Sequence, residues 1–159
     1  MKRMIVVIAA AVMIVTPVLA ATDLEVMIYG HNTFSSITGA AKLAGEPTVF
    51  ETKDKTKTIY YFTVNGVDVG FIVKDGAVKS CYCRASEESV GEFLSQSVSV
   101  LYNICGTESL SYWYPNILDQ FLTARSGETS DIHPFIENIC AFEITKENGL
   151  YQMIAAKLY

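Results

Sequence analysis

The sequence predicts an α+β domain, an antiparallel sheet of about six strands with helices packed on it, in the order α-ββββ-αα-ββ. Three observations lead to this prediction. Apolar residues recur at helical spacing in three segments and at every second position in the segments between and after them. Short turn sequences, among them Asn65-Gly66 and Asn148-Gly149, join the alternating segments. Such short connections make neighbouring strands antiparallel.

The chain begins with the features of a bacterial secretory signal peptide over residues 1–20. Lys2 and Arg3 form a positive start, an apolar stretch follows over residues 4–15, and small residues precede Ala21. This stretch is shorter than the roughly twenty residues that a membrane-spanning helix needs. We therefore expect cleavage before Ala21, a secreted, periplasmic or cell-surface location, and no membrane span after cleavage. An uncleaved N-terminal anchor is the alternative.

The mature chain, residues 21–159, has the length of one domain and is acidic. The full sequence contains 12 basic and 17 acidic residues, and two of the basic ones belong to the signal peptide, so the mature net charge is −7. An acidic surface repels nucleic acid and anionic lipid. We therefore expect a protein or small-molecule partner and no nucleic acid. The sequence leaves the oligomeric state open.

The first predicted helix starts at a capping box of Thr22 and Glu25 and ends before Gly39. Gly30 weakens this helix by about 1 kcal/mol relative to alanine. The residues at helical spacing on its apolar face are Leu24, Met27, Ile28, His31 and Phe34.

Two strands are predicted over residues 48–53 and 58–64, and Asn65-Gly66 then forms a hairpin, because a type I′ turn needs positive φ at both residues. The pairs that this turn places on one apolar face are Val64 with Val67, Phe62 with Val69, and Tyr60 with Phe71. On the other face Tyr61 opposes Gly70, where its ring can cover the glycine backbone. The apolar pairs predict a face that packs on the core.

A second hairpin is predicted at Asp75-Gly76, with two possible registers. A two-residue loop directs Val78, Ser80 and Tyr82 to the core. A three-residue loop with a glycine bulge directs Lys79, Cys81 and Cys83 inward instead. We favour the first register, because it keeps Lys79 in water.

Two further helices follow. Ser86 caps the first of them, and Glu87 and Glu88 stand at its positive end. Its apolar stripe consists of Val90, Phe93, Leu94, Val98, Leu101, Ile104 and Cys105. Thr107 is expected to cap the second helix, in which Pro115 predicts a kink or a restart. The apolar stripe of this helix consists of Leu110, Trp113, Tyr114, Ile117, Leu118, Phe121 and Leu122.

The last two predicted strands, residues 136–144 and 150–159, are joined by Asn148-Gly149. A helix followed by a strand meander resembles the layout of cystatins. This resemblance is one of layout only. The size of the chain and its cysteine content admit a secreted protease inhibitor as one hypothesis. The Gln-rich hairpin motif of cystatin inhibitors is absent from the sequence.

The four cysteines, Cys81, Cys83, Cys105 and Cys140, are the disulfide candidates, since an even count in an oxidising compartment is typical of bridges. Placement along the chain favours Cys81 with Cys105, and Cys83 with Cys140. The preferred hairpin register conflicts with this pairing and leaves Cys105 with Cys140 as an alternative. Free thiols and a zinc site are further alternatives. A zinc site lacks the usual pair of Cys-x-x-Cys motifs.

The histidines do not assemble a catalytic motif. His31 lies on the apolar face of the first predicted helix, and His133 precedes Pro134 in a predicted loop. The sequence contains no nucleophile elbow, phosphate-binding loop or zinc-helix motif. We therefore assign no catalytic, cofactor-binding or metal-binding residues and expect no cofactor.

The leading hypothesis is an exported, non-enzymatic binding or interaction module of unknown ligand, with recognition by the sheet face or the loops. The first alternative is a small secreted hydrolase or thiol enzyme that pairs Cys81 or Cys83 with His31 or His133. The second alternative is the protease inhibitor.

Overall fold

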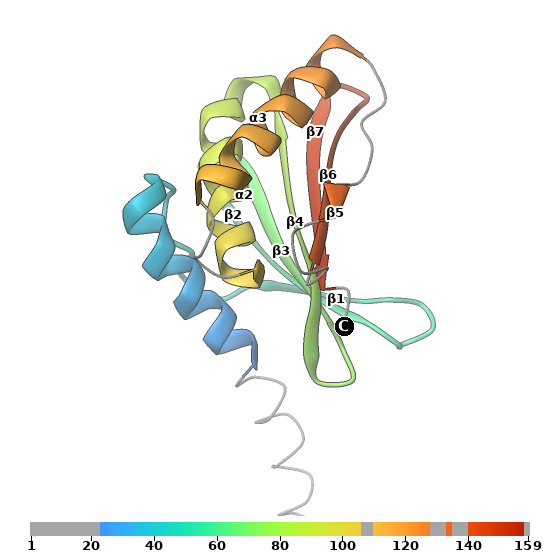
Figure 1. The fold of residues 1–159 in the computed structure, drawn as a ribbon. Coiled ribbons are helices and arrows are strands. Elements are labelled where there is room, and N and C mark those ends of the chain that lie inside the picture. Colours follow the sequence, from blue (N-terminus) through green and yellow to red (C-terminus); the bar gives the residue numbers. More distant parts are fainter. Residues whose placement is uncertain (1–22, 106–109, 128–132, 135–139, 158–159) are drawn as a thin grey trace, which may run out of the picture.

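The computed structural model of the chain describes residues 23–105, 110–127, 133–134 and 140–157 (Figure 1). The predicted signal peptide and Thr22 lie outside these residues. The described part of the chain opens with a helix over residues 23–38, called the N-terminal helix below. The elements after it are β1 (Thr48–Glu51), β2 (Thr58–Val64), β3 (Val67–Lys74), β4 (Ala77–Ser86), the short 3-10 helix η1 (Glu87–Ser89), α2 (Val90–Cys105), α3 (Leu110–Ser126), β5 (His133–Pro134), β6 (Cys140–Glu147) and β7 (Leu150–Lys157).

The strands form one antiparallel sheet in the order β1-β2-β3-β4-β7-β6-β5. The N-terminal helix, α2 and α3 lie on the same side of this sheet (Figure 1). The predicted fold class and element order are confirmed, and the two-residue strand β5 is an addition to them. The sheet thus has one face under helices, called the covered face below, and one open face.

The core lies between the covered face and the helices. Alternate side chains of the central strands point into it, as the two-residue period requires. Its largest fully buried apolar side chains are Phe71, Phe93, Leu101, Ile117, Phe142, Ile144, Tyr151 and Met153. Tyr151 stacks obliquely against Phe93 of α2 and Phe121 of α3, with ring centroids 5.9 and 5.0 Å away. One aromatic side chain of β7 thus joins both helices to the sheet.

The hairpin between β2 and β3 has the predicted register. Asn65 and Gly66 have φ values of 49° and 77°, as a type I′ turn requires. All three predicted core-facing pairs and the pair of Tyr61 with Gly70 are present. This hairpin follows from local turn chemistry and apolar alternation alone.

The hairpin between β3 and β4 follows neither predicted register throughout. Its turn has two residues, so Val78 pairs with Val73 and is buried as predicted. A β-bulge at Lys79 then shifts the register, so that Ser80 pairs with Ile72. The favoured assignment of Ser80 and Tyr82 to the core is therefore wrong. The bulge turns the alternate set Cys81, Cys83 and Ala85 inward and leaves Lys79 exposed.

The N-terminal helix packs closely on α2 at Gly30. A Cβ at this position would overlap the side-chain amide of Asn103 in α2. The same amide donates a hydrogen bond to the Met27 carbonyl. Glycine inside the helix is therefore explained by the close approach of the two helices, which offsets its poor helix propensity.

Helix α3 departs from its predicted stripe. Tyr114, Leu118 and Leu122 are exposed, although the apolar spacing placed them in the core. The buried face carries Ile117, Phe121 and Ala124 instead. The apolar stripe is wider than the face that the sheet contacts, so its outer rows remain in solvent. The helix runs from Leu110 to Ser126 through Pro115 without a restart.

Candidate functional site

The structure brings none of the predicted disulfide partners together among the residues it describes. Cys81 and Cys83 are fully buried on the covered face of β4, and both are free thiols. The predicted Cys81–Cys105 and Cys83–Cys140 bridges are therefore not formed in the structure. The side chains of Cys105 and Cys140 lie outside the described part, so a bridge between these two remains a prediction.

The two buried thiols are poor nucleophiles. Burial raises the pKa of Cys81 far above its ordinary value, and the neighbouring Cys83 raises it further. Burial likewise raises the pKa of Cys83, against a smaller lowering by the Ser97 hydroxyl. The thiolate is the reactive form of cysteine. Both groups are therefore protonated at neutral pH and closed to solvent.

His31 is buried between the N-terminal helix and α2. Its Nε2 donates a hydrogen bond of 2.7 Å to Gln96 Oε1. Burial lowers the pKa of this imidazole, and hydrogen bonds to Asn32 and Gln96 and the charge of Glu92 partly oppose the effect. His31 is thus a neutral group with a structural role. His133 lies in β5 rather than in a loop, and its side chain is outside the described part.

The Gln96 side chain extends this network to the segment after the N-terminal helix. Its amide nitrogen donates to the Ala41 carbonyl at 2.8 Å and to Glu92 Oε1 at 2.6 Å. Glu92 also accepts the Ala41 backbone N–H at 2.8 Å. Each polar group of the network has a partner on a neighbouring segment. The arrangement fastens the N-terminal helix to α2 and offers no free group for chemistry.

Glu87 joins four elements at one end of the sheet. Its carboxylate accepts hydrogen bonds from the Tyr151 hydroxyl at 2.7 Å and from Lys146 Nζ at 2.8 Å, and it pairs with Arg125 at 3.2 Å. The hydrogen bond from Lys146, followed by the one from Tyr151, lowers the pKa of Glu87. This residue was expected only to complement the helix start. Its partners make it a surface ion-pair centre that holds η1, α3, β6 and β7 together.

The open face of the sheet has a different organisation, because the strand registers align its outward side chains in three rows. The first row is Phe50, Ile59, Ile72, Ser80 and Ala156. The second row is Thr48, Tyr61, Gly70, Tyr82, Ile154 and Glu143. The third row is Thr63, Asp68, Arg84, Gln152 and Thr145. Apolar, aromatic and charged side chains therefore follow one another along the strands.

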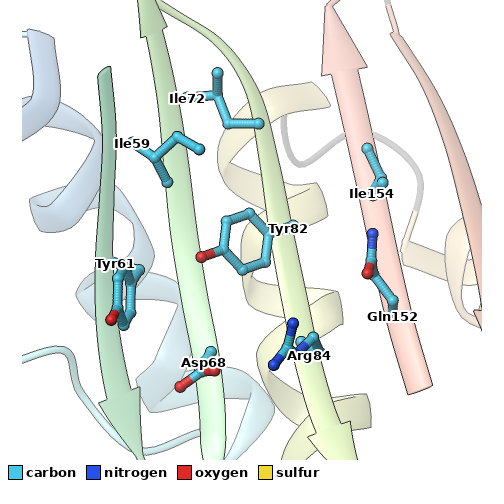
Figure 2. Close-up of a pocket in the computed structure, with 8 residues that line it drawn as sticks. All are labelled: Ile59, Tyr61, Asp68, Ile72, Tyr82, Arg84, Gln152 and Ile154. Carbon is cyan, nitrogen blue, oxygen red and sulfur yellow. The ribbon is translucent and has the colours of Figure 1, made fainter. Parts of the chain in front are cut away.

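These rows enclose a groove of about 400 Å³, called the open-face groove below (Figure 2). Its lining residues are Ile59, Tyr61, Asp68, Ile72, Tyr82, Arg84, Gln152 and Ile154. The volume falls in the range of small-molecule sites, roughly 300–1,000 Å³. Figure 2 shows Ile59 and Ile72 toward one end, Asp68 and Arg84 toward the other, and the two tyrosines between them, with Ile154 and Gln152 along the β7 side.

Gly70 shapes the middle of the groove. It stands between Tyr61 and Tyr82 in the second row and contributes no side chain. A Cβ here would overlap the Tyr82 ring, so the ring leans over the bare glycine backbone. The sequence predicted that the Tyr61 ring would cover the Gly70 backbone, but the Tyr82 ring covers it. Burial raises the pKa of Tyr82, and Asp68 and Tyr61 add to the effect while Arg84 opposes it.

Most polar side chains of the groove make no side-chain hydrogen bond or ion pair with the described residues. Asp68 accepts one hydrogen bond, from the Thr63 hydroxyl at 2.7 Å. Within the described part of the chain, the Arg84 guanidinium makes no ion pair and no side-chain hydrogen bond. The same holds, among these residues, for the Tyr61 and Tyr82 hydroxyls and the Gln152 amide. The groove thus presents donors and acceptors beside an apolar patch.

The sequence predicts the outward direction of only half of the residues that line the open-face groove. The register of the first hairpin places Ile59 and Tyr61 outward, and that register was predicted. Tyr82 was assigned to the core, and Arg84 follows it on the same side of β4. The bulge at Lys79 moves both to the open face. Bulges carry no strong local sequence signal here, so the β4 side of the site was missed.

A second groove of about 370 Å³ lies among the helices. Its lining residues are Ile37, Thr38, Gly91, Leu94, Ser95, Val98 and Tyr114. It carries no charged side chain, which distinguishes it from the open-face groove.

The described residues contain no cluster of three or more histidine, cysteine, aspartate or glutamate side chains that could hold a metal ion. None of their helices has the length and apolar character needed to cross a bilayer. No protein-family model, curated protein sequence or solved structure matches this chain.

Proposed function

We propose that the mature protein is an exported, non-enzymatic binding module and that the open-face groove is its ligand-binding site. The observation that carries this proposal is the set of uncommitted polar groups around Tyr82, placed beside an apolar patch. Sites for small ligands combine apolar walls with a few polar groups that fix orientation. The open-face groove has both components, drawn from four neighbouring strands.

The construction of the sheet supports this choice of face. Helices bury the side chains of the covered face, which is therefore occupied by the core. The open face retains side chains that the core does not need. Tyr82, Gln152 and Asp68 are only half-buried, so a ligand can reach them. Export is part of the proposal and rests on the signal-peptide features of residues 1–20.

The thiol-enzyme hypothesis receives no support from the site geometry. It requires an accessible thiolate beside a histidine that acts as a base. Cys81 and Cys83 are buried and protonated, and the His31 ring is hydrogen-bonded to Gln96. The inhibitor hypothesis rests on size and cysteine content, and the described residues add no observation in its favour.

The test uses anilinonaphthalene sulfonate, a fluorescent aromatic anion, titrated into the mature protein. We expect fluorescence enhancement from binding in the open-face groove, between the tyrosines and next to Arg84. Tyr82→Ala should abolish most of the signal, and Gly70→Ala should weaken it because the added Cβ displaces the Tyr82 ring. Urea unfolding of each variant confirms that it is folded.

Tyr114→Ala is the matched control. It removes an aromatic side chain of the second groove and leaves the open face unchanged. The proposal predicts that this variant binds the dye like the parent protein. A signal that survives Tyr82→Ala and disappears in Tyr114→Ala would overturn the proposal.

A further inference from the structure

The charged end of the open-face groove contains two opposite charges that do not pair. Asp68 and Arg84 are direct cross-strand partners on β3 and β4. Oppositely charged side chains in such positions commonly form an ion pair. No ion pair joins these two side chains in the part of the chain that the structure describes.

Thr63 accounts for their separation. Its hydroxyl donates a hydrogen bond of 2.7 Å to Asp68 Oδ1. Thr63 is the cross-strand partner of Asp68 on β2, the side opposite Arg84. The hydrogen bond therefore holds the carboxylate toward β2 and away from β4. The groove keeps a fixed negative group and a free guanidinium side by side.

The rest of the groove is apolar and aromatic. From the row of Asp68 and Arg84 to the row of Ile59 and Ile72, each strand advances four residues, which is about 13 Å. The two tyrosines occupy the row between. A ligand with a charged head at one end has room for a large apolar body toward the isoleucines.

We infer that the open-face groove binds a free α-amino acid with a large apolar or aromatic side chain. This inference rests on the proposed function and adds the ligand class. The ligand carboxylate pairs with Arg84, whose planar guanidinium matches it in a bidentate way. The ligand ammonium pairs with Asp68, and the side chain packs between the tyrosines and on the isoleucines.

Electrostatics favours a zwitterion over a ligand of single charge. A simple carboxylate at Arg84 would also lie near Asp68, and a simple amine at Asp68 would lie near Arg84. Each would gain one attraction and suffer one repulsion at similar range. The adjacent ammonium and carboxylate of an α-amino acid gain both attractions. The acidic charge of the whole chain further disfavours a simple anion.

The experiment titrates L-phenylalanine into isotope-labelled mature protein and follows backbone amide shifts by NMR. Two matched probes each lack one charge: phenethylamine has no carboxylate, and phenylpropanoate has no ammonium. We expect phenylalanine to bind about fivefold more tightly than either, because each probe lacks one charged pair and a partly exposed pair contributes up to about that factor. The shifted amides should be those of the groove.

Two variants assign the charges. Arg84→Gln should lower the affinity for phenylalanine and phenylpropanoate about fivefold and raise the affinity for phenethylamine, because it removes the charge that repels the amine. Asp68→Asn should lower the affinity for phenylalanine and phenethylamine and raise the affinity for phenylpropanoate, because it removes the charge that repels the carboxylate. Both residues stand on the open face, away from the core, and urea unfolding confirms that the variants are folded.

Several results would overturn the inference: no binding of phenylalanine, equal binding of all three probes, or variants that affect every probe alike. The dye titration separates this failure from failure of the proposed function. If the dye signal still depends on Tyr82, the groove binds ligands of another class and only the inference falls. If Tyr82→Ala leaves the dye signal unchanged, the proposed function falls as well.

Discussion

His31 shows how one buried side chain acquires a structural role. It has no exposed surface, donates through Nε2 to Gln96, and has a pKa below its ordinary value of 6.5 because burial penalises the charged form. The unfolded chain binds a proton near the ordinary pKa, and the folded chain binds it only at lower pH. Stability is therefore complete above that ordinary value and falls as the pH drops below it.

This linkage gives a prediction for His31. Between about pH 7.5 and about pH 5.5, the free energy of unfolding should fall more in the parent protein than in His31→Gln, which cannot titrate. Urea unfolding at several pH values measures the difference. Equal pH dependence in the two proteins would mean that His31 is solvated or charged in the fold.

The cysteines give a second prediction at the residue scale. Native mature protein should show no fast reaction of Cys81 or Cys83 with a thiol reagent, because both are buried and protonated. In urea both should react. The measurement is alkylation followed by peptide mapping. Rapid alkylation of either residue at neutral pH in the native state would contradict this prediction and support the thiol-enzyme hypothesis.

At the scale of elements, the two β-hairpins show what local sequence can and cannot determine. Asn65-Gly66 and the alternation around it determine the first hairpin completely. In the second, Asp75-Gly76 determines the turn, and the register beyond it depends on a bulge at Lys79. The bulge buries Cys81 and Cys83 against the helices, so its reason is tertiary packing. Half of the candidate site depends on that bulge.

The first hairpin can be tested through its glycine. Gly66 has a φ of 77°, and a side chain here would also meet the Ser89 hydroxyl. We expect Gly66→Val to lower the free energy of unfolding by about 1–3 kcal/mol, as for a residue forced into a sparsely populated backbone region. Gly91→Ala is the control, because a Cβ on this helical glycine meets open space. A Gly66→Val variant as stable as the parent in urea would contradict the turn assignment.

At the scale of the whole molecule, the sheet carries the described helices on one face only, and its other face is open (Figure 1). The His31–Gln96 network and the Glu87 ion pairs fasten the helices and the sheet at separate places. The open face is thereby left as a supported surface that the core does not use. Apolar spacing predicted where the helices lie in the sequence. It did not predict that the outer rows of α3 are exposed, because spacing does not show how much of a helix the sheet covers.

Export is a prediction at the same scale. Residues 1–20 should be removed, and the mature chain should start at Ala21, because small residues precede that position. Intact mass of protein recovered outside the cytoplasm measures the start. A membrane-bound species that retains Met1 would contradict cleavage.

The central claim is that ligands bind on the open face and not among the helices. The most direct measurement is an NMR map of backbone amides in the mature protein during titration with anilinonaphthalene sulfonate. The account predicts shifts concentrated at Tyr61, Gly70, Tyr82 and Gln152, with little change around Leu94. Shifts concentrated around Leu94 and Val98, with the open face unchanged, would contradict it.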